Sequence, residues 1–338
     1  MNSIIKKREK ENVKNTNPKN IKFCDYLSQN SYSLSTLCNA FCLFKSINDI
    51  IYLVYIDKNN SIICYNLINK QIINEIKNIN GLIKCLKYYL DKINKRDLII
   101  SIFDYHNAIK IWNINNFECL FSIKNINISG SINSVCVLND NNQNYIVTSN
   151  INYRGTSEPI KIFNFNGIKV KEIKDSYEQT YSIDTYYDNK LCKYYIFTSN
   201  DNYAKSYDYN ENKMYHKYNN NNEYGFLINL IIKKNKKLIE LIGSTINGYI
   251  IIWNFHTRDL LKTIRVGKQL YGICLWNKDY LFVGCFKLIK LIDIKNGMII
   301  KTLNKHEQEV VTIKKITHPI YGECLISHGI NDIILWTT

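Results

Sequence analysis

Short runs of alternating hydrophobic and polar residues fill the chain from about residue 21 to its end, separated by turns rich in Asn, Asp and Gly. This period of two is typical of strands with one buried face. One kind of run ends in an aromatic or apolar residue that Asn or Asp usually follows. This key position recurs seven times, at intervals of 39 to 51 residues, at Tyr65, Trp112, Phe163, Tyr207, Trp253, Ile292 and Trp336. The pattern predicts seven repeats.

Each repeat contains further β-like runs around the key position. Upstream of it, apolar residues spaced three apart open a first run: Leu82/Cys85, Ile132/Val135, Leu270/Ile273 and Val310/Ile313, with Thr180/Ile183 weaker. A second run precedes the key run, and a fourth follows it after a turn. Four such runs predict a four-stranded antiparallel sheet. A lone sheet cannot bury two apolar faces, whereas seven sheets packed around an axis can, which predicts a propeller.

The two ends of the chain are expected to close the ring. The last repeat stops after its third run, at Thr338, and a spare run at residues 21–28 precedes the first complete repeat. We expect this run to supply the missing outer strand of the last blade. The sequence thus predicts an all-β, seven-bladed propeller over residues 21–338 behind a basic, disordered tail at residues 1–20. The predicted blades are 36–79, 81–124, 131–174, 179–219, 223–266, 269–305 and 308–338 with 21–28.

The last repeat carries the residues of a known repeat motif. Its Lys305-His306, Val310, Ser327 and Trp336 resemble the WD-repeat β-propeller family, and the resemblance covers residues 21–338. The repeats are degenerate, because Asn usually replaces the Asp of the terminal dipeptide and one repeat alone keeps the histidine. The resemblance implies a buried hydrogen-bond chain through His306, Ser327 and Trp336. Its fourth member is open between two acceptors, Asn331 and Asp332.

Composition adds charge and thiols to this picture. The chain has 44 Lys and Arg against 29 Asp and Glu, a formal charge of +15. Only five are Arg, and Lys, Asn, Ile and Tyr abound together, which indicates a compositional bias with Lys as a general surface residue. The 11 Cys residues include no CxxC pair and mostly lie in apolar runs. Buried, reduced thiols are expected, and with no signal peptide or membrane span they predict the cytoplasm or the nucleus.

Motifs of catalysis are missing from the sequence. It contains no GxxxxGK[ST], GxGxxG, GxSxG or HExxH, and its six histidines show no metal-ligand spacing. We therefore expect a non-enzymatic protein with no cofactor and no metal. Binding is the natural use of such a scaffold, because its turns and links present a broad surface on one face.

On that face, the turns between second and third strands and the links between blades carry Tyr and Arg, the residue types of interface hot spots. The resulting protein-binding hypothesis names Tyr105, His106, Tyr153, Arg154, Tyr177 and Tyr203. The expected function is a protein–protein interaction scaffold whose partners are other proteins or peptides.

Two alternatives stay open. One is a substrate-recognition subunit of a larger complex such as a ubiquitin ligase, although His256 stands where the family's adaptor-binding motif requires Arg. The other is binding of nucleic acid or an anionic membrane through the basic charge, whose mark would be a steep salt dependence. The family's paired-arginine lipid motif is missing, since no two arginines are adjacent.

Overall fold

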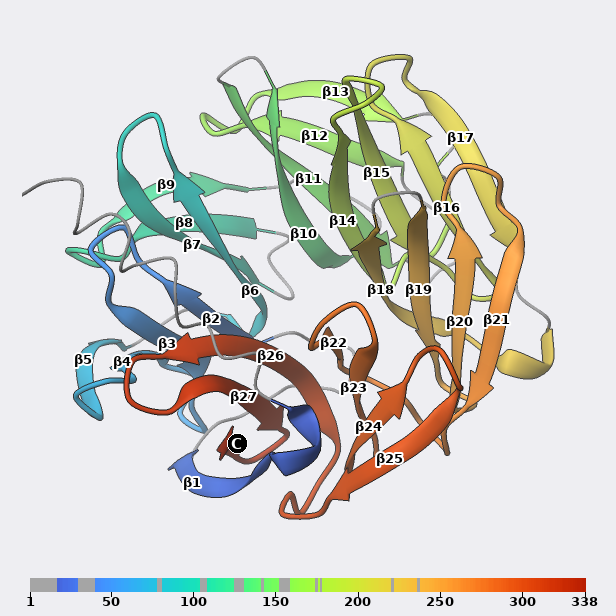
Figure 1. The fold of residues 1–338 in the computed structure, drawn as a ribbon. Helices are drawn as coiled ribbons and strands as arrows, with labels where there is room; N and C mark the ends of the chain where they lie inside the picture. The colour runs from blue at the N-terminus through green and yellow to red at the C-terminus, as the bar shows by residue number, and fades with distance from the viewer. Residues whose placement is uncertain are drawn as a thin grey trace, which may run out of the picture.

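A computed structural model describes most of the chain as seven sheets arranged around an axis (Figure 1). Each sheet has four antiparallel strands, and neighbours in the sheet are neighbours in sequence in every blade but the last. The seven-bladed propeller predicted from the repeats is therefore confirmed. The residues described are 17–29, 40–77, 81–103, 108–124, 131–140, 143–151, 159–173, 176, 178–219, 222–235 and 238–338.

The strands follow one another from the axis outward within each blade, as first to fourth strand. Blades 1 to 3 comprise β2 (Phe41–Lys45), β3 (Ile51–Ile56), β4 (Ile62–Asn66), β5 (Gln71–Ile76); β6 (Ile83–Asp91), β7 (Arg96–Phe103), β8 (Ala108–Asn113), β9 (Cys119–Ile123); β10 (Ser131–Asp140), β11 (Gln143–Ile151), β12 (Ile160–Asn164) and β13 (Lys169–Ile173). Blades 4 and 5 comprise β14 (Ser182–Asp188), β15 (Lys193–Ser199), β16 (Tyr203–Asp208), β17 (Lys213–Asn219); β18 (Leu227–Lys234), β19 (Ile239–Thr245), β20 (Tyr249–Asn254) and β21 (Leu260–Arg265). Blade 6 comprises β22 (Ile273–Leu275), β23 (Tyr280–Gly284), β24 (Ile289–Asp293) and β25 (Met298–Leu303).

Blade 7 joins the two ends of the chain, as predicted. Its strands β26 (Val310–His318), β27 (Gly322–Gly329) and β28 (Ile333–Thr337) are completed by β1 (Lys22–Ser28), which pairs antiparallel with β28. Just before β1, a 3₁₀ helix spans Pro18–Asn20 with Pro18 buried, and Lys301 Nζ donates to the Lys19 carbonyl at 2.8 Å. The predicted disordered tail at residues 1–20 is thus wrong at its last residues, while residues 1–16 lie outside the described part.

The core lies between neighbouring blades, where the apolar faces of adjacent sheets meet. In blade 2 the pair that packs back on blade 1 is Ile83 and Leu86, so the expected pair Leu82/Cys85 is wrong by one residue. A register shift in the ladder between Ile83 and Cys85 places Ile83 and Leu86, three residues apart, on the same face. Such a shift turns the next side chain to the opposite face, and Cys85 accordingly packs with blade 3.

A β-bulge accompanies the key position in every blade. In blade 7 the register shift between Phe23 and Asp25 of β1 lies opposite Trp336 and Leu335. A bulge increases local twist and re-aims a side chain, and six of the seven key residues are buried, Tyr65 being partly so. In the other six blades the ladder between third and fourth strands shifts at Cys64/Tyr65, Ile111/Trp112, Ile162/Phe163, Ser206/Tyr207, Ile252/Trp253 and Leu291/Ile292.

In blades 4, 5 and 6 the residue two places after the key position ties its blade to the preceding one, a role that the sequence pattern does not reveal. Its backbone carbonyl accepts a hydrogen bond from the outer strand of the preceding blade. Lys171 Nζ donates to the Tyr209 carbonyl at 2.6 Å, and Tyr218 Oη to the Phe255 carbonyl at 2.6 Å. Lys262 Nζ likewise lies 3.3 Å from the Ile294 carbonyl. These contacts fix the blades against one another, and so fix the loops that each blade carries.

Candidate functional site

The propeller has two faces with different loops. We call loop-bearing face the one formed by the turns between second and third strands and by the links between blades. The opposite face carries the turns between first and second and between third and fourth strands. Of the predicted binding residues, Tyr105, His106, Tyr153, Arg154 and Tyr177 lie outside the described residues. Tyr203 is described, so the candidate site begins with its surroundings in blade 4.

Tyr203 opens β16 on the loop-bearing face and is half-buried. Burial and a hydrogen bond with the Glu178 carboxylate raise the pKa of its phenol. Lys217 Nζ lies 3.8 Å from the centroid of its ring, a cation–π contact. The side chain is therefore held by contacts on two sides, and it presents part of its ring on a rigid base.

Glu178 links this turn to the chain entering blade 4. Its carboxylate accepts a hydrogen bond from Lys205 Nζ at 2.6 Å, and the Lys205 side chain is only 9% exposed. Asn200 adds a bond from its Nδ2 to the Gln179 carbonyl at 2.7 Å. Breaking a buried ion pair such as Lys205–Glu178 is costly. The link before blade 4 and the turn between β15 and β16 therefore form one ordered surface.

The most exposed aromatic side chain of this surface is Phe226, just before β18. It is 46% exposed and stacks on Tyr181, with centroids 5.9 Å apart and planes 18° apart. Tyr181 is fixed in turn, because its hydroxyl donates to Asp201 Oδ1 at 2.6 Å. Gly225 has a φ of +72°, a conformation that favours glycine. We call Tyr181, Tyr203 and Phe226 the aromatic patch.

Tyr203 was predicted as a site residue from the sequence, and Phe226 was not. The predicted residues were chosen chiefly among Tyr and Arg side chains in turns and links, which leaves phenylalanine out. The signal for Phe226 was an apolar residue following a glycine in a polar link, YGF, where the next strand starts one residue later. Such a residue reads equally well as the first buried position of the strand.

Blade 7 contains the hydrogen-bond chain that the resemblance implied. Trp336 Nε1 donates to Ser327 Oγ at 2.7 Å, and Ser327 Oγ lies 2.6 Å from His306 Nε2. His306 Nδ1 lies 2.5 Å from Asp332 Oδ1. Asp332 is therefore the fourth member, and Asn331 is not. The four side chains form one continuous hydrogen-bonded series in blade 7, which is the arrangement of a stabilising network.

A shorter version of this chain occurs in blade 2. Trp112 Nε1 donates to Ser101 Oγ at 2.8 Å. In both blades the serine lies two residues after the residue that pairs with the tryptophan. The serine and the tryptophan are 11 residues apart in blade 2 and 9 apart in blade 7, and this difference in the intervening turn concealed the correspondence. In blade 5 the indole of Trp253 instead donates to the Asn219 carbonyl of blade 4 at 3.2 Å.

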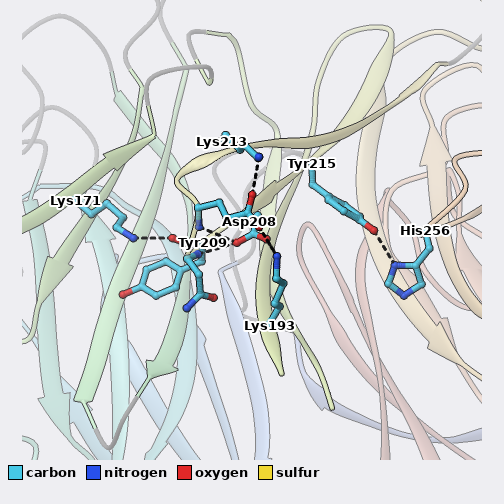
Figure 2. Close-up of polar contacts among 9 residues, drawn as sticks. Lys171, Lys193, Asp208, Tyr209, Lys213, Tyr215 and His256 are labelled. Atoms are coloured by element: carbon cyan, nitrogen blue, oxygen red, sulfur yellow. Dashed lines mark hydrogen bonds and ion pairs between the residues drawn. The ribbon is translucent and has the colours of Figure 1, made fainter. Parts of the chain in front are cut away.

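The opposite face carries a network of ion pairs around blade 4 (Figure 2). Lys193 Nζ contacts Asp208 at 2.8 Å and Glu211 at 2.5 Å, and Lys213 contacts Glu211 at 2.6 Å. Hydrogen bonds from these two lysines lower the pKa of Glu211 to about 2. The exposed pair of Lys213 and Glu211 contributes little to stability, whereas the Asp208 carboxylate is buried. Together these pairs fix the turn between β16 and β17.

His256 bridges blades 4 and 5 on the same face. Its Nε2 lies 3.0 Å from Asp188 Oδ2, and its Nδ1 lies 3.2 Å from the Tyr215 hydroxyl (Figure 2). Because residues of blade 4 contact both ring nitrogens, the imidazole connects blades 4 and 5. Neither nitrogen is left to contact a substrate. Among the described residues, no group of three or more His, Cys, Asp or Glu side chains could hold a metal ion.

Neither a protein-family model nor a curated protein matches the chain. Within the described ranges, no helix is long and apolar enough to cross a membrane.

Proposed function

We propose that this protein is a non-catalytic interaction scaffold of the WD-repeat type, which binds other proteins or peptides through the loop-bearing face at blades 4 and 5. The observation that carries the proposal is the stack of Phe226 on Tyr181, with Tyr181 anchored to Asp201. An exposed aromatic ring that is already fixed loses little conformational entropy on binding. Aromatic anchors of this kind dominate the binding energy of protein interfaces.

The WD-repeat assignment is supported by the seven blades and by the Trp–Ser–His–Asp chain of blade 7. The rigid ring suits a scaffold, because blades are tied by side chains that cross between them, such as Lys171 and Tyr218. A site in the cytoplasm or the nucleus belongs to the same proposal. It is supported by thiols such as Cys42 and Cys64, which are buried and unpaired.

Affinity capture from cell lysate at moderate and high salt tests this function. The wild type is compared with Phe226→Ala, which removes the exposed ring of the aromatic patch. The matched control is Met298→Ala, since Met298 is 64% exposed at the start of the outer strand of blade 6, beside the opposite face. We expect proteins that the wild type and the control retain at high salt and that Phe226→Ala loses.

Two outcomes would contradict the proposal. Equal recovery of every protein by Phe226→Ala and wild type would remove the aromatic patch from the interface. Recovery dominated by nucleic acid or lipid and abolished by salt would assign the function to the +15 charge, because counterion release makes such binding steeply salt-dependent.

A further inference from the structure

One ring of seven side chains surrounds the axis of the propeller. The strand pairing defines it. In each blade, the residue two places before the key residue pairs with a residue of the second strand, and that residue pairs in turn with one of the first strand. The first-strand residues found in this way are Phe41, Leu86, Val135, Ile183, Leu230, Ile273 and Ile313. The next residue of each innermost strand is therefore equivalent in all blades. These residues are Cys42, Lys87, Cys136, Asp184, Ile231, Cys274 and Lys314, and we call them the channel ring.

A cavity of about 120 Å³ is lined by four residues of this ring, Lys87, Asp184, Ile231 and Lys314. The cavity is lined by residues from the innermost strands of blades 2 to 5 and blade 7, and by Gly272 and Ile273 of blade 6. Because these strands surround the axis of the ring (Figure 1), the cavity lies in the central channel of the propeller. Two residues before the ring, toward the loop-bearing face, the lining contains Cys85, Gly272 and a set of hydroxyl and amide groups. These groups belong to Ser134, Ser182, Asn229 and Thr312.

The charges of the ring do not cancel. Lys87 Nζ lies 3.7 Å from Asp184 Oδ2, a loose ion pair that crosses from blade 2 to blade 4, and the Asp184 charge raises the pKa of Lys87. Lys314 has no carboxylate or hydrogen-bond partner among the residues that the structure describes. Burial raises the pKa of the Cys42 and Cys136 thiols, which are therefore uncharged at neutral pH. Two ammonium groups thus face one carboxylate.

We propose that the central channel is a binding site for a small oxyanion, a phosphate or carboxylate group, held by Lys314 and Lys87 with the hydroxyls above them. An unpaired cation between low-dielectric walls focuses its field along the channel and attracts anions. Charge-assisted hydrogen bonds from two lysines and neighbouring hydroxyls satisfy an oxyanion's several acceptor sites. The channel has the size and the donors for such a group, which enters as a free ion or on an acidic partner.

Titration of the full-length protein with inorganic phosphate and with acetate tests the proposal. Ionic strength is held constant with chloride, and binding is followed by calorimetry and by the shift of the thermal unfolding midpoint. We expect saturable stabilisation of the wild type. Lys314→Met should weaken binding by about tenfold, the equivalent of one charge-assisted hydrogen bond. The matched control is Lys278→Met, an exposed lysine of the opposite face, which should bind as the wild type does.

A second variant moves the affinity in the other direction. Asp184→Asn removes the only carboxylate of the ring and frees Lys87, so the oxyanion should bind more tightly by about three- to tenfold. A variant that merely damaged the fold would weaken binding, so opposite effects of Asp184→Asn and Lys314→Met are diagnostic. Tighter binding of phosphate than acetate assigns the site to phosphoryl groups, and the reverse assigns it to carboxylates. No saturable response to either ion, or equal losses in Lys314→Met and Lys278→Met, overturns the proposal.

Discussion

Blades 7 and 5 solve one packing problem in two ways. Both bury a tryptophan at the key position, Trp336 in blade 7 and Trp253 in blade 5, and a buried indole N–H requires an acceptor. In blade 7 that acceptor is Ser327, inside the same blade. In blade 5 the equivalent position is Gly243, and the indole reaches the Asn219 carbonyl of the neighbouring blade.

The difference extends to what surrounds each tryptophan. Ser327 continues into the polar chain of His306 and Asp332. Around Gly243 the space is filled by apolar side chains, because a Cβ built there would lie 2.6 Å from Leu227 Cδ2 and 3.2 Å from Leu230 Cδ2. The comparison teaches that a tryptophan buried at the key position requires an acceptor for its indole N–H, and that the hydrogen-bond chain of blade 7 is one of two ways in which this propeller supplies it.

Deleting residues 21–28 should have the largest effect, because it breaks blade 7 where the chain ends meet. The deletion removes β1, exposes the edge of β28, and uncovers Trp336, which packs with Phe23. We expect a loss of several kcal/mol out of the 5–15 kcal/mol that is typical of a folded protein. Chemical denaturation measures it. Deleting residues 1–16 is the control, and equal losses from both deletions would contradict the closing role of β1.

Gly243→Ser tests whether blade 5 can accept the polar solution of blade 7. The new side chain would collide with Leu227 and Leu230, and overpacking of this kind costs about 1–3 kcal/mol. Gly243→Ala separates the two contributions, since it adds the same Cβ without a hydroxyl. Thermal unfolding should show both variants destabilised alike. A stabilised serine variant would mean that Trp253 had gained a hydrogen bond and that the two blades are interchangeable.

His306→Ala breaks the polar chain at its middle. Ser327 and Asp332 then lose a buried partner, at a cost of about 1–3 kcal/mol in the free energy of unfolding. In a double-mutant cycle with Ser327→Ala, the two losses should sum to more than the double variant loses. Partner binding at the aromatic patch should not change. A loss confined to partner affinity, with stability intact, would reassign His306 from a structural to a binding residue.

The fold was predictable because it repeats. Seven key positions at nearly constant intervals fix the number of blades, and the spare run at residues 21–28 fixes how the ring closes. Details that depend on a single bulge were not predictable: the sequence around Leu82 and Cys85 is equally apolar in either register, and the shift at Ile83 decides which face each residue takes.

The candidate site was less predictable than the fold. Residue type alone pointed to Tyr203, but its contacts with Glu178 and Lys217 join segments that no spacing relates. Asp332 was one of two candidates, and only the geometry of the turn after β27 brings its carboxylate to His306. The channel ring could not be recognised at all, because its residues share a position and not a chemical type.

His328 offers the finest comparison, since it lies beside Ser327 and yet belongs to no network. It is fully buried, its ring stacks on Phe41 at 5.4 Å, and neither nitrogen has a hydrogen-bond partner in the described part of the chain. Burial, followed by the charge of His306, lowers its pKa to about 3. The imidazole is therefore neutral in the folded protein over the whole range in which an unfolded histidine titrates.

This pKa difference makes stability depend on pH. Between about pH 6.5 and 3 the unfolded chain binds a proton at His328 and the folded protein does not, so stability falls as the pH is lowered. From pH 7 to 5 the loss amounts to about 2 kcal/mol. His328→Phe keeps a flat ring against Phe41 and removes the titrating group, so urea denaturation should show this part of the loss abolished. His216 and His318, whose pKa values are also lowered, remain in both proteins and cancel in the difference. Parallel pH profiles of variant and wild type would contradict this prediction, because they would mean that the His328 imidazole has a hydrogen-bond partner or is reached by water in the folded protein.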